Sequence, residues 1–273
     1  MAKIGIIGHG FVGEATEYGF RRNGNQIFIH DKFKNSLSLA EVVLKSDFIF
    51  ICVPTPYKKN RIDLSIMDEV MAKVAKLTEE TGKIVIIKST VIPGTTKNYQ
   101  KKYRGINLCF NPEFLREANH LKDFMKTDRL IIGASDNFTK FKVTNLYKKI
   151  LPKTPIFCTD TVSAEMVKYM ANTFLATKVI FANEMFELCK KLRINYDEVK
   201  KMVGADRRIG QSHFDITKER GFGGKCFPKD LVALIGLFED LGIDASLLKT
   251  VWRKNLKIRK VKDWEKIPFV KTG

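Results

Sequence analysis

The sequence has few cysteines, no long apolar run and a shortage of acidic residues. Five cysteines occur among 273 residues and no two form a CxxC pair, so we expect neither a disulfide framework nor a zinc ribbon, and we predict no metal site. No stretch of about 18 apolar residues is present, which argues against a membrane span, and the N-terminus has no signal-peptide pattern. We therefore expect a soluble, reduced, cytoplasmic protein.

Acidic residues are outnumbered, because 30 Asp and Glu stand against 48 Lys and Arg, for a formal net charge of +18. Such an excess favours anionic partners, whether nucleic acid, an anionic membrane surface or phosphate-bearing small molecules. No recognised nucleic-acid motif accompanies the charge, and the basic residues are spread along predicted helices, where a solvated face is their ordinary role. Nucleic-acid binding is therefore not favoured.

The first 160 residues alternate short strand-like runs with helical stretches, which predicts an α/β fold with a doubly wound parallel sheet. Predicted strands cover residues 3–7, 26–31, 47–53, 83–89, 107–110, 129–133 and 154–158. The pattern then changes, because residues 160–193 contain no Pro or Gly and predict one long helix. We expect an α/β domain over residues 1–160 and an all-helical domain over residues 161–273.

A glycine-rich turn, Gly8-His-Gly10-Phe-Val-Gly13, follows the first predicted strand and opens a helix, and Asp31 ends the next strand. This context is the Rossmann dinucleotide fingerprint: a tight turn, a close backbone approach to the pyrophosphate and close helix–sheet packing. A carboxylate at Asp31 would bind the ribose and repel a 2′-phosphate, which favours NAD over NADP. The alternative is an ordinary tight turn. Other predicted cofactor contacts in these segments are Phe11, Val12 and Lys32.

Two further segments follow predicted strands, where ligands bind in open α/β sheets. Val53, Pro54 and Thr55 come after the third strand, and Thr90 closes the fourth. Proline and hydroxyl side chains are also common in ordinary loops, so turn chemistry is the alternative for each segment.

A second glycine-rich segment, residues 221–230, has a different composition and contains Cys226 just before a predicted helix start. A helix N-terminus, together with Lys225 and Lys229, would favour the thiolate and make it a nucleophile. Asp230 lies one helical turn later, on the same face. The alternative for Cys226 is a buried structural thiol, the reading we prefer for the other four cysteines.

Lys168 and Asn172 lie four residues apart on the long predicted helix. A cation and an amide at this spacing can stabilise a developing oxyanion. A solvated helix face is the alternative reading of the pair.

In combination, these motifs resemble the UDP-glucose/GDP-mannose dehydrogenase family. They occur in the family's order, cover residues 3–240, and include Arg208-Ile-Gly210. The remaining matching segments are Gly8–Gly13, Val53–Pro56, Lys88–Thr90, Phe110–Glu117, Lys168–Asn172 and Gly221–Asp230.

The resemblance implies a nucleotide-sugar 6-dehydrogenase that uses two NAD+ to oxidise the C6 alcohol of UDP-glucose to a carboxylate. Cys226 would hold the substrate carbon as a thiohemiacetal and then as a thioester. Lys168 and Asn172 would stabilise negative charge on the C6 oxygen, and Asp230 would position the hydrolytic water.

The resemblance also implies the other site residues. Glu117 and Thr90 would act through a bound water. These two residues and Lys229 would lie near the cofactor. Arg208 is similar to an arginine that family members insert into a neighbouring subunit's substrate site, and the long helix implies a homodimer. Expected substrate contacts are Glu113, Phe114, Leu115, Arg116, Lys168, Asn172, Arg208, Phe214, Gly221, Phe222 and Gly223.

The sequence departs from the family pattern in two places. Residues 211–220 look expanded, and Phe214 is our choice for a sugar-facing aromatic. Family members usually carry a third, nucleotide-binding domain, which we do not expect here, because the helix after Asp244 fades into a basic tail that starts at Lys249. The alternatives are a GDP-mannose 6-dehydrogenase and a truncated, non-catalytic nucleotide-sugar and NAD-binding protein that needs a partner.

Overall fold

The computed structural model describes residues 1–58 and 61–266, and the chain divides into two units. The first unit comprises Met1–Thr55 and Asp63–Lys168, so it continues into the long helix α7 (Thr161–Leu192). The second unit comprises Pro56–Ile62 and the described chain from Tyr169 onward.

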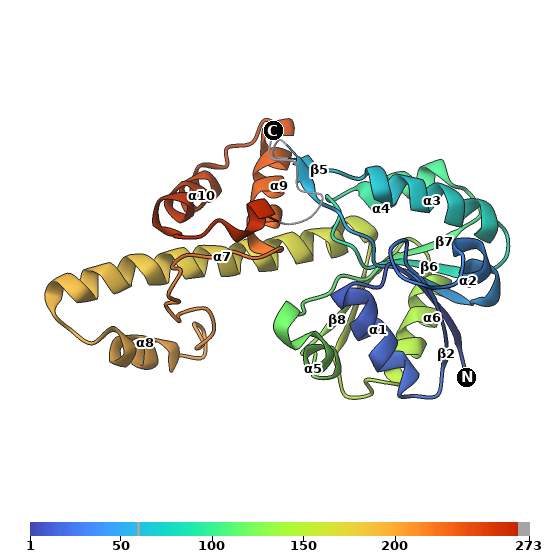
Figure 1. The fold of residues 1–273 in the computed structure, drawn as a ribbon, viewed down its shortest axis with the longest axis horizontal. Helices are drawn as coiled ribbons and strands as arrows, with labels where there is room; N and C mark the ends of the chain where they lie inside the picture. Colours follow the sequence, from blue (N-terminus) through green and yellow to red (C-terminus); the bar gives the residue numbers. More distant parts are fainter. Residues whose placement is uncertain (59–60, 267–273) are drawn as a thin grey trace. The chain divides into compact units, whose positions relative to one another are not determined.

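Seven strands of the first unit form one sheet in the order β2-β1-β3-β6-β7-β8-β9 (Figure 1). The strands are short and mostly rich in β-branched residues, and most strand residues are buried, as expected for a sheet covered on both faces. The predicted Rossmann-type α/β architecture is confirmed. The strands are β1 (Lys3–Ile7), β2 (Gln26–His30), β3 (Phe48–Ile51), β6 (Ile84–Ile87), β7 (Asn107–Phe110), β8 (Leu130–Ala134) and β9 (Ile156–Thr159).

The prediction of an entirely parallel sheet is wrong at one pairing. Strand β8 runs antiparallel to β7, while β9 is again parallel to β8. A parallel crossover needs a connection that returns the chain to the starting edge of the sheet, usually a helix. Between β7 and β8 the chain forms only the 3-10 turn η1 (Glu117–Asn119) and the six-residue helix α5 (His120–Met125).

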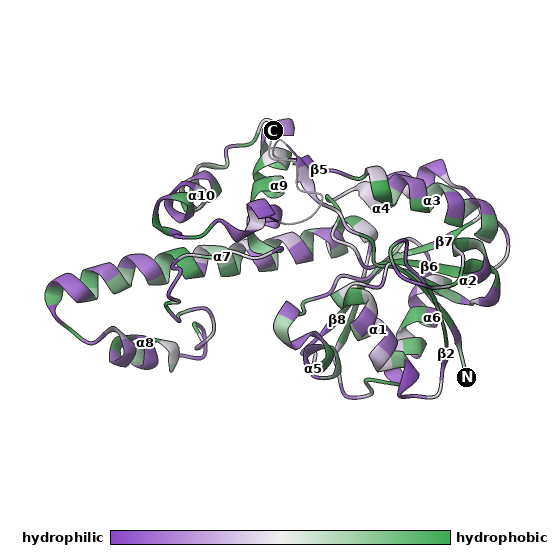
Figure 2. Ribbon diagram, viewed as in Figure 1, coloured by the Kyte–Doolittle hydropathy of each residue, from purple (hydrophilic) through white to green (hydrophobic). Residues whose placement is uncertain are grey.

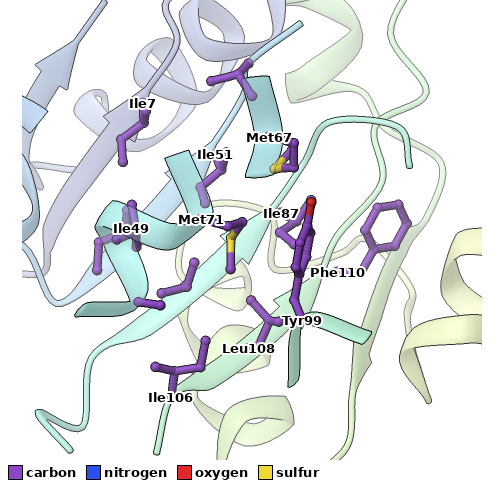
Figure 3. Close-up of a cluster of buried hydrophobic side chains, with 14 of the residues drawn as sticks. Ile7, Ile49, Ile51, Met67, Met71, Ile87, Tyr99, Ile106, Leu108 and Phe110 are labelled. Atoms are coloured by element: carbon purple, nitrogen blue, oxygen red, sulfur yellow. The ribbon is translucent and has the colours of Figure 1, made fainter. Parts of the chain in front are cut away.

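Helices cover both faces of this sheet, and the strands alternate between two cores. Ile49, Ile51 and Ile87 pack toward α2 (Leu39–Lys45), α3 (Ser65–Thr78) and α4 (Thr95–Lys102), as Figure 3 shows for part of this cluster. Ile6, Phe50 and Ile86 pack in the other core. That core faces α1 (Phe11–Arg21), α5 and α6 (Asn137–Lys148).

The second unit is helical except for one small hairpin. Residues of α7, α9 (Phe227–Asp240) and α10 (Ser246–Ile258) share a core with Phe222, while α8 (Tyr196–Gly204) contacts α7 through the Phe186–Tyr196 ring pair. Strands β4 (Tyr57–Lys58) and β5 (Arg61–Ile62) form a hairpin that the sequence did not predict. Arg61 pairs with Asp240 at 2.7 Å, which joins this hairpin to α9.

The prediction of a basic tail from Lys249 is wrong for the residues that the structure describes. This segment belongs to α10 and continues into the 3-10 helix η2 (Asp263–Lys266), in which Trp264 is only 2% exposed. The hydrophobic and hydrophilic bands along α10 in Figure 2 explain why the segment folds: the helix is amphipathic, and its apolar face includes Val251 in the core. The last part of the predicted tail, residues 267–273, lies outside the described residues.

Candidate active site

The glycine-rich turn between β1 and α1 has the geometry that a bound dinucleotide needs. Gly8 has a φ of +89°, and a Cβ on Gly13 would lie 2.2 Å from the carbonyl oxygen of Gly8. Gly10 is the N-cap of α1, and a Cβ there would have no atom within 4 Å. The helix N-terminus therefore has open space in front of Gly10, where a pyrophosphate fits.

Asp31 follows β2, and its carboxylate is already fixed. Its Oδ2 accepts a hydrogen bond from the His9 backbone N–H at 2.7 Å, and its Oδ1 accepts one from Phe33 N–H at 2.9 Å. Although partial burial opposes ionisation, these two N–H groups and the Lys34 ammonium keep the pKa of Asp31 below its ordinary value. Asp31 is thus an ionised acceptor beside the glycine-rich turn, while its neighbour Lys32 is exposed.

The two predicted loops at the carboxyl ends of β3 and β6 are bonded to each other. Thr55 Oγ1 donates to the backbone oxygen of Thr90 at 2.8 Å, and Ser89 Oγ donates to that of Val53 at 2.7 Å. Pro54, between them, is exposed. The first unit therefore brings these sequence-distant segments together at one edge of the sheet.

Lys168 is buried at the end of the first unit. Its Nζ donates to the backbone oxygen of Glu113 at 2.5 Å and lies 3.3 Å from Glu113 Oε1. The ring of Phe114 lies 5.2 Å from the same Nζ. Only 3% of Lys168 is exposed, which excludes the solvated helix face.

The neighbouring residues of the Phe110–Glu117 motif point elsewhere. Leu115 packs against the α1-side core, and its N–H donates to Glu113 Oε2 at 2.6 Å. Arg116 is largely exposed and pairs with Asp123 at 2.7 Å, and Glu117 begins η1. Arg116 is therefore engaged with α5 in this structure.

A buried polar cluster centred on Lys88 was missed by sequence reasoning. Lys88 Nζ donates to Asn111 Oδ1 at 2.9 Å, and the Tyr147 hydroxyl donates to the same oxygen at 2.5 Å. Burial lowers the pKa of Lys88, and burial raises the pKa of Cys52 to about 12, as expected for a structural thiol. The signal available in the sequence was a lysine directly after the apolar β6 run.

The second unit forms a compact cluster around Asp230, which is fully buried. Asn172 Nδ2 donates to Asp230 Oδ2 at 2.6 Å, and Lys229 Nζ lies 2.5 Å from Asp230 Oδ1. Cys226 is the N-cap of α9, and its carbonyl oxygen accepts the Asp230 N–H at 2.9 Å. Pro228 lies in the first turn. The expected helix start at Cys226 is confirmed, and the burial of Asn172 excludes a solvated face for it too.

Three predicted substrate contacts have structural roles in this unit. Phe222 is buried in the core beside α9 and α10. A Cβ on Gly221 or Gly223 would lie 2.3 Å from a side-chain oxygen, that of Asn255 or Asp263 respectively. A Cβ at either glycine would thus meet the protein itself, and contact of this loop with a sugar stays a prediction.

Phe214 and Arg208 differ in exposure. Phe214 is buried, with Lys178 Nζ 4.6 Å from its ring centre and its backbone oxygen bonded to the Tyr196 hydroxyl, so its choice as a sugar-facing aromatic is not supported. Arg208 has 89% of its side chain exposed and pairs with Asp206. Asp206 lies two residues before Arg208, so this ion pair is local.

Other classes of site receive no support from the structure. Within residues 1–58 and 61–266, no three His, Cys, Asp or Glu side chains are grouped so that they could hold a metal ion. In the same described ranges, every helix is too short or too polar to cross a membrane.

The glycine-rich turn between β1 and α1 defines a dinucleotide-binding α/β fold, and a helical unit with a cysteine at a helix start follows it. The chain belongs to the UDP-glucose/GDP-mannose dehydrogenase family. The family's NAD binding domain matches residues 28–151, and its central domain matches residues 162–257. NAD is accordingly the cofactor of this fold.

Relatives with stated activities cover most of this chain. It is 39% identical to UDP-glucose 6-dehydrogenase of Rickettsia prowazekii over 77% of this chain and 49% of the relative, and 32% identical to GDP-mannose 6-dehydrogenase of Pseudomonas syringae over 82% and 54%. The structure of a UDP-glucose dehydrogenase from Pyrobaculum islandicum matches with a TM-score of 0.85 and 31% identity, over 94% of this chain and 68% of that one. The chain spans about half the length of the curated relatives it matches.

Proposed function

We propose that the protein oxidises the C6 alcohol of UDP-glucose to the carboxylate, with two NAD+ and a covalent intermediate on Cys226. The observation that carries this proposal is the cluster at the start of α9. There a cysteine precedes a buried aspartate by one turn, and an amide and an ammonium hold that aspartate. A nucleophile beside a fixed carboxylate suits covalent capture followed by hydrolysis.

Each side chain of the second unit has a distinct part in this chemistry. The Cys226 thiolate attacks the aldehyde carbon, because a bare aldehyde has no oxyanion from which to expel hydride. Asn172 fixes Asp230 through its 2.6 Å bond and offers its amide to the C6 oxygen. Asp230 orients the water that attacks the thioester.

The first unit supplies the cofactor site and a buried cation. The Gly8–Gly13 turn and Asp31 bind NAD+, which accepts the hydride when bound. Lys168 stabilises negative charge on the C6 oxygen, and Glu113, which holds Lys168 in place, orders the loop above the sugar. Thr90 and Glu117 pass protons through a bound water.

The reaction balances in four steps. The alcohol loses hydride and a proton to give the aldehyde, and the thiolate adds to its carbon with uptake of a proton. A second hydride and a proton leave to give the thioester. Water then replaces sulfur, which releases the carboxylate and two protons and restores the Cys226 thiolate. The sum is two NADH and three protons for each sugar. The step through Cys226 requires a reduced thiol, which the cytoplasm, the location we propose, maintains.

The assembly we propose is a homodimer through α7. Phe174, Phe181 and Leu188 recur every seven residues and are exposed by 67%, 52% and 51%, and Met170 and Leu192 extend the same apolar stripe. Exposed stripes of this kind mark helix-pairing faces. The exposed Arg208 is available to a neighbouring subunit's substrate site.

The test is NADH release with purified protein and a panel of nucleotide sugars. We expect two NADH per UDP-glucose. GDP-mannose is the second candidate substrate, because the chain is similar to the Pseudomonas GDP-mannose 6-dehydrogenase, and we expect a lower kcat/KM for it than for UDP-glucose. A single NADH per sugar would contradict the four-electron reaction. Absence of turnover with every sugar would support a binding protein that needs a partner.

A further inference from the structure

The Gly221–Gly224 loop that leads into Cys226 is held along its whole length by the C-terminal segment of the second unit. At its centre, Asn255 of α10 forms two hydrogen bonds with one residue of the loop. Asn255 Nδ2 donates to the Phe222 backbone oxygen at 3.0 Å, and Phe222 N–H donates to Asn255 Oδ1 at 2.8 Å. Asn255 is completely buried, so no water can replace these bonds.

The two ends of the loop are held by one ion pair. Arg259 donates to the Arg220 backbone oxygen at 2.9 Å and pairs with Asp263 Oδ2 at 3.0 Å. The other oxygen of Asp263 accepts the Gly224 N–H at 3.2 Å. Arg259 and Asp263 thus connect the entry and the exit of the loop.

The glycines of the loop fit these contacts. A Cβ on Gly221 would lie 2.3 Å from Asn255 Oδ1, and one on Gly223 would lie 2.3 Å from Asp263 Oδ1. An aromatic layer completes the packing, because Phe222 stacks on Trp252 at 6.3 Å and Trp252 contacts Trp264 at 5.5 Å. The backbone hydrogen bonds, the glycines and the aromatic layer of the loop therefore all contact the same segment, from α10 to η2.

We propose that Asn255, Arg259 and Asp263 are positioning residues that fix the Gly221–Gly224 loop and thereby aim the thiol of Cys226. The proposal rests on the proposed function, in which that thiol attacks a carbonyl carbon. A nucleophile displaced by about 1 Å can lose roughly a hundredfold in rate without any change in its own chemistry. The segment read from the sequence as a basic tail therefore serves catalysis through the cysteine loop.

The first test compares turnover of the full chain with Asn255→Ala or Asp263→Ala. We expect kcat to fall at least about tenfold while the KM for NAD+ stays within about twofold, because the cofactor turn is untouched. Asp263→Asn keeps an acceptor for the Gly224 N–H and should retain more activity than Asp263→Ala. Lys254→Ala is the matched control: Lys254 precedes Asn255 on α10 but pairs with Glu184 of α7, and this variant should keep its kcat.

The second test needs no substrate, so it separates failure of this proposal from failure of the proposed function. The rate of Cys226 alkylation by iodoacetamide is measured by peptide mapping, with the exposed Cys158 as internal standard. A loosened loop should raise that rate at least about threefold in both alanine variants. Asp263 is partly exposed, so its variant folds even where Asn255→Ala does not. An alkylation rate at or below that of the unmodified sequence, or an equal loss of kcat in Lys254→Ala, would overturn the proposal.

Discussion

Glu165, Lys168 and Lys88 are charged side chains that the first unit buries almost completely, and each is compensated differently. Lys168 contacts the Glu113 carboxylate, whereas Lys88 bonds neutral oxygens of Asn111. Glu165, in the first turns of α7, accepts backbone N–H bonds at the start of α4. A buried charge without a full counter-charge is held at the expense of stability, so Glu165 and Lys88, whose pKa values burial shifts, link the fold to pH.

Glu165 is expected to make stability fall as the pH rises. Burial raises the pKa of its carboxyl to about 7, although the N–H groups of Thr96 and Gly94 oppose this shift. The folded state therefore holds the proton more tightly than the unfolded chain, and the stabilisation is lost between about pH 4.5 and pH 7. At about 1.4 kcal/mol per pKa unit, the loss is roughly 3 kcal/mol.

Thermal unfolding between pH 5 and pH 8 measures this effect. As the pH rises from 5 to 8, the Tm of the unmodified chain should fall more than that of Glu165→Gln, because the glutamine amide does not titrate. Glu69→Gln, at an exposed ion pair with Lys73, is the control and should follow the unmodified chain. Parallel curves for the unmodified chain and Glu165→Gln would contradict the assignment.

At this scale, the sequence could identify residues whose role is local but not residues that tertiary contacts define. Gly8, Gly13 and Asp31 were predictable because a tight turn and a strand end constrain them within a few dozen residues. The neighbours of Lys168 and Asn172 come from segments more than 50 residues away, so no periodicity could show that both are buried. The packing of Phe214 beside Lys178 and Tyr196 likewise depends on tertiary contacts that the sequence pattern does not show.

At the scale of elements, two glycines of the turn between β1 and α1 have different roles: Gly13 is needed for folding and Gly10 for cofactor binding. Gly13→Ala places a Cβ 2.2 Å from a backbone oxygen, so the turn or α1 must shift. We expect the Tm to fall by at least about 5 °C. Gly10→Ala meets no atom within 4 Å and should leave the Tm unchanged.

The variant that leaves the Tm unchanged, Gly10→Ala, should instead weaken cofactor binding. A methyl group on Gly10 would occupy the open space before the helix N-terminus, so the Kd for NAD+ should rise at least about tenfold. Titration calorimetry with NAD+ provides the measurement. Tight NAD+ binding by Gly10→Ala would argue against a pyrophosphate at this position.

Most elements could be predicted, because strands and helices of the first unit differ clearly in hydrophobic period. The direction of β8 and the β4–β5 hairpin could not, since both depend on where a strand finds its partner. The folded segment α10–η2 was read as a tail because its eight lysines and arginines after residue 248 outweigh its few apolar residues. Its stability comes from partners in α7, α9 and the cysteine loop.

At the scale of the whole molecule, the α7 stripe predicts self-association. Phe181→Glu places a charge in the middle of the stripe, and light scattering coupled to size exclusion should then report about half the original mass. Phe141→Glu alters a phenylalanine on α6 that is even more exposed and is not part of the stripe, and this variant should remain dimeric. A monomeric unmodified chain, or a dimeric Phe181→Glu, would contradict pairing through this face.

The excess of positive charge has a partial explanation at this scale. NAD+ and the nucleotide sugar that we propose as substrate both carry diphosphates, which fits the anionic partners expected from a net charge of +18. Several basic residues instead serve the fold, as Arg259 does beside Asp263 and Arg61 beside Asp240. Composition alone could not distinguish these two uses.

The central claim, a covalent intermediate on Cys226, is tested most directly by the intact mass of Cys226→Ser after incubation with UDP-glucose and NAD+. A serine can form the hemiacetal and, after the second hydride transfer, an oxygen ester, which water releases more slowly than a thioester. The account predicts a protein mass increased by one esterified UDP-sugar, with the adduct on residue 226 and little further NADH release. An unmodified mass together with sustained release of two NADH per sugar would contradict it.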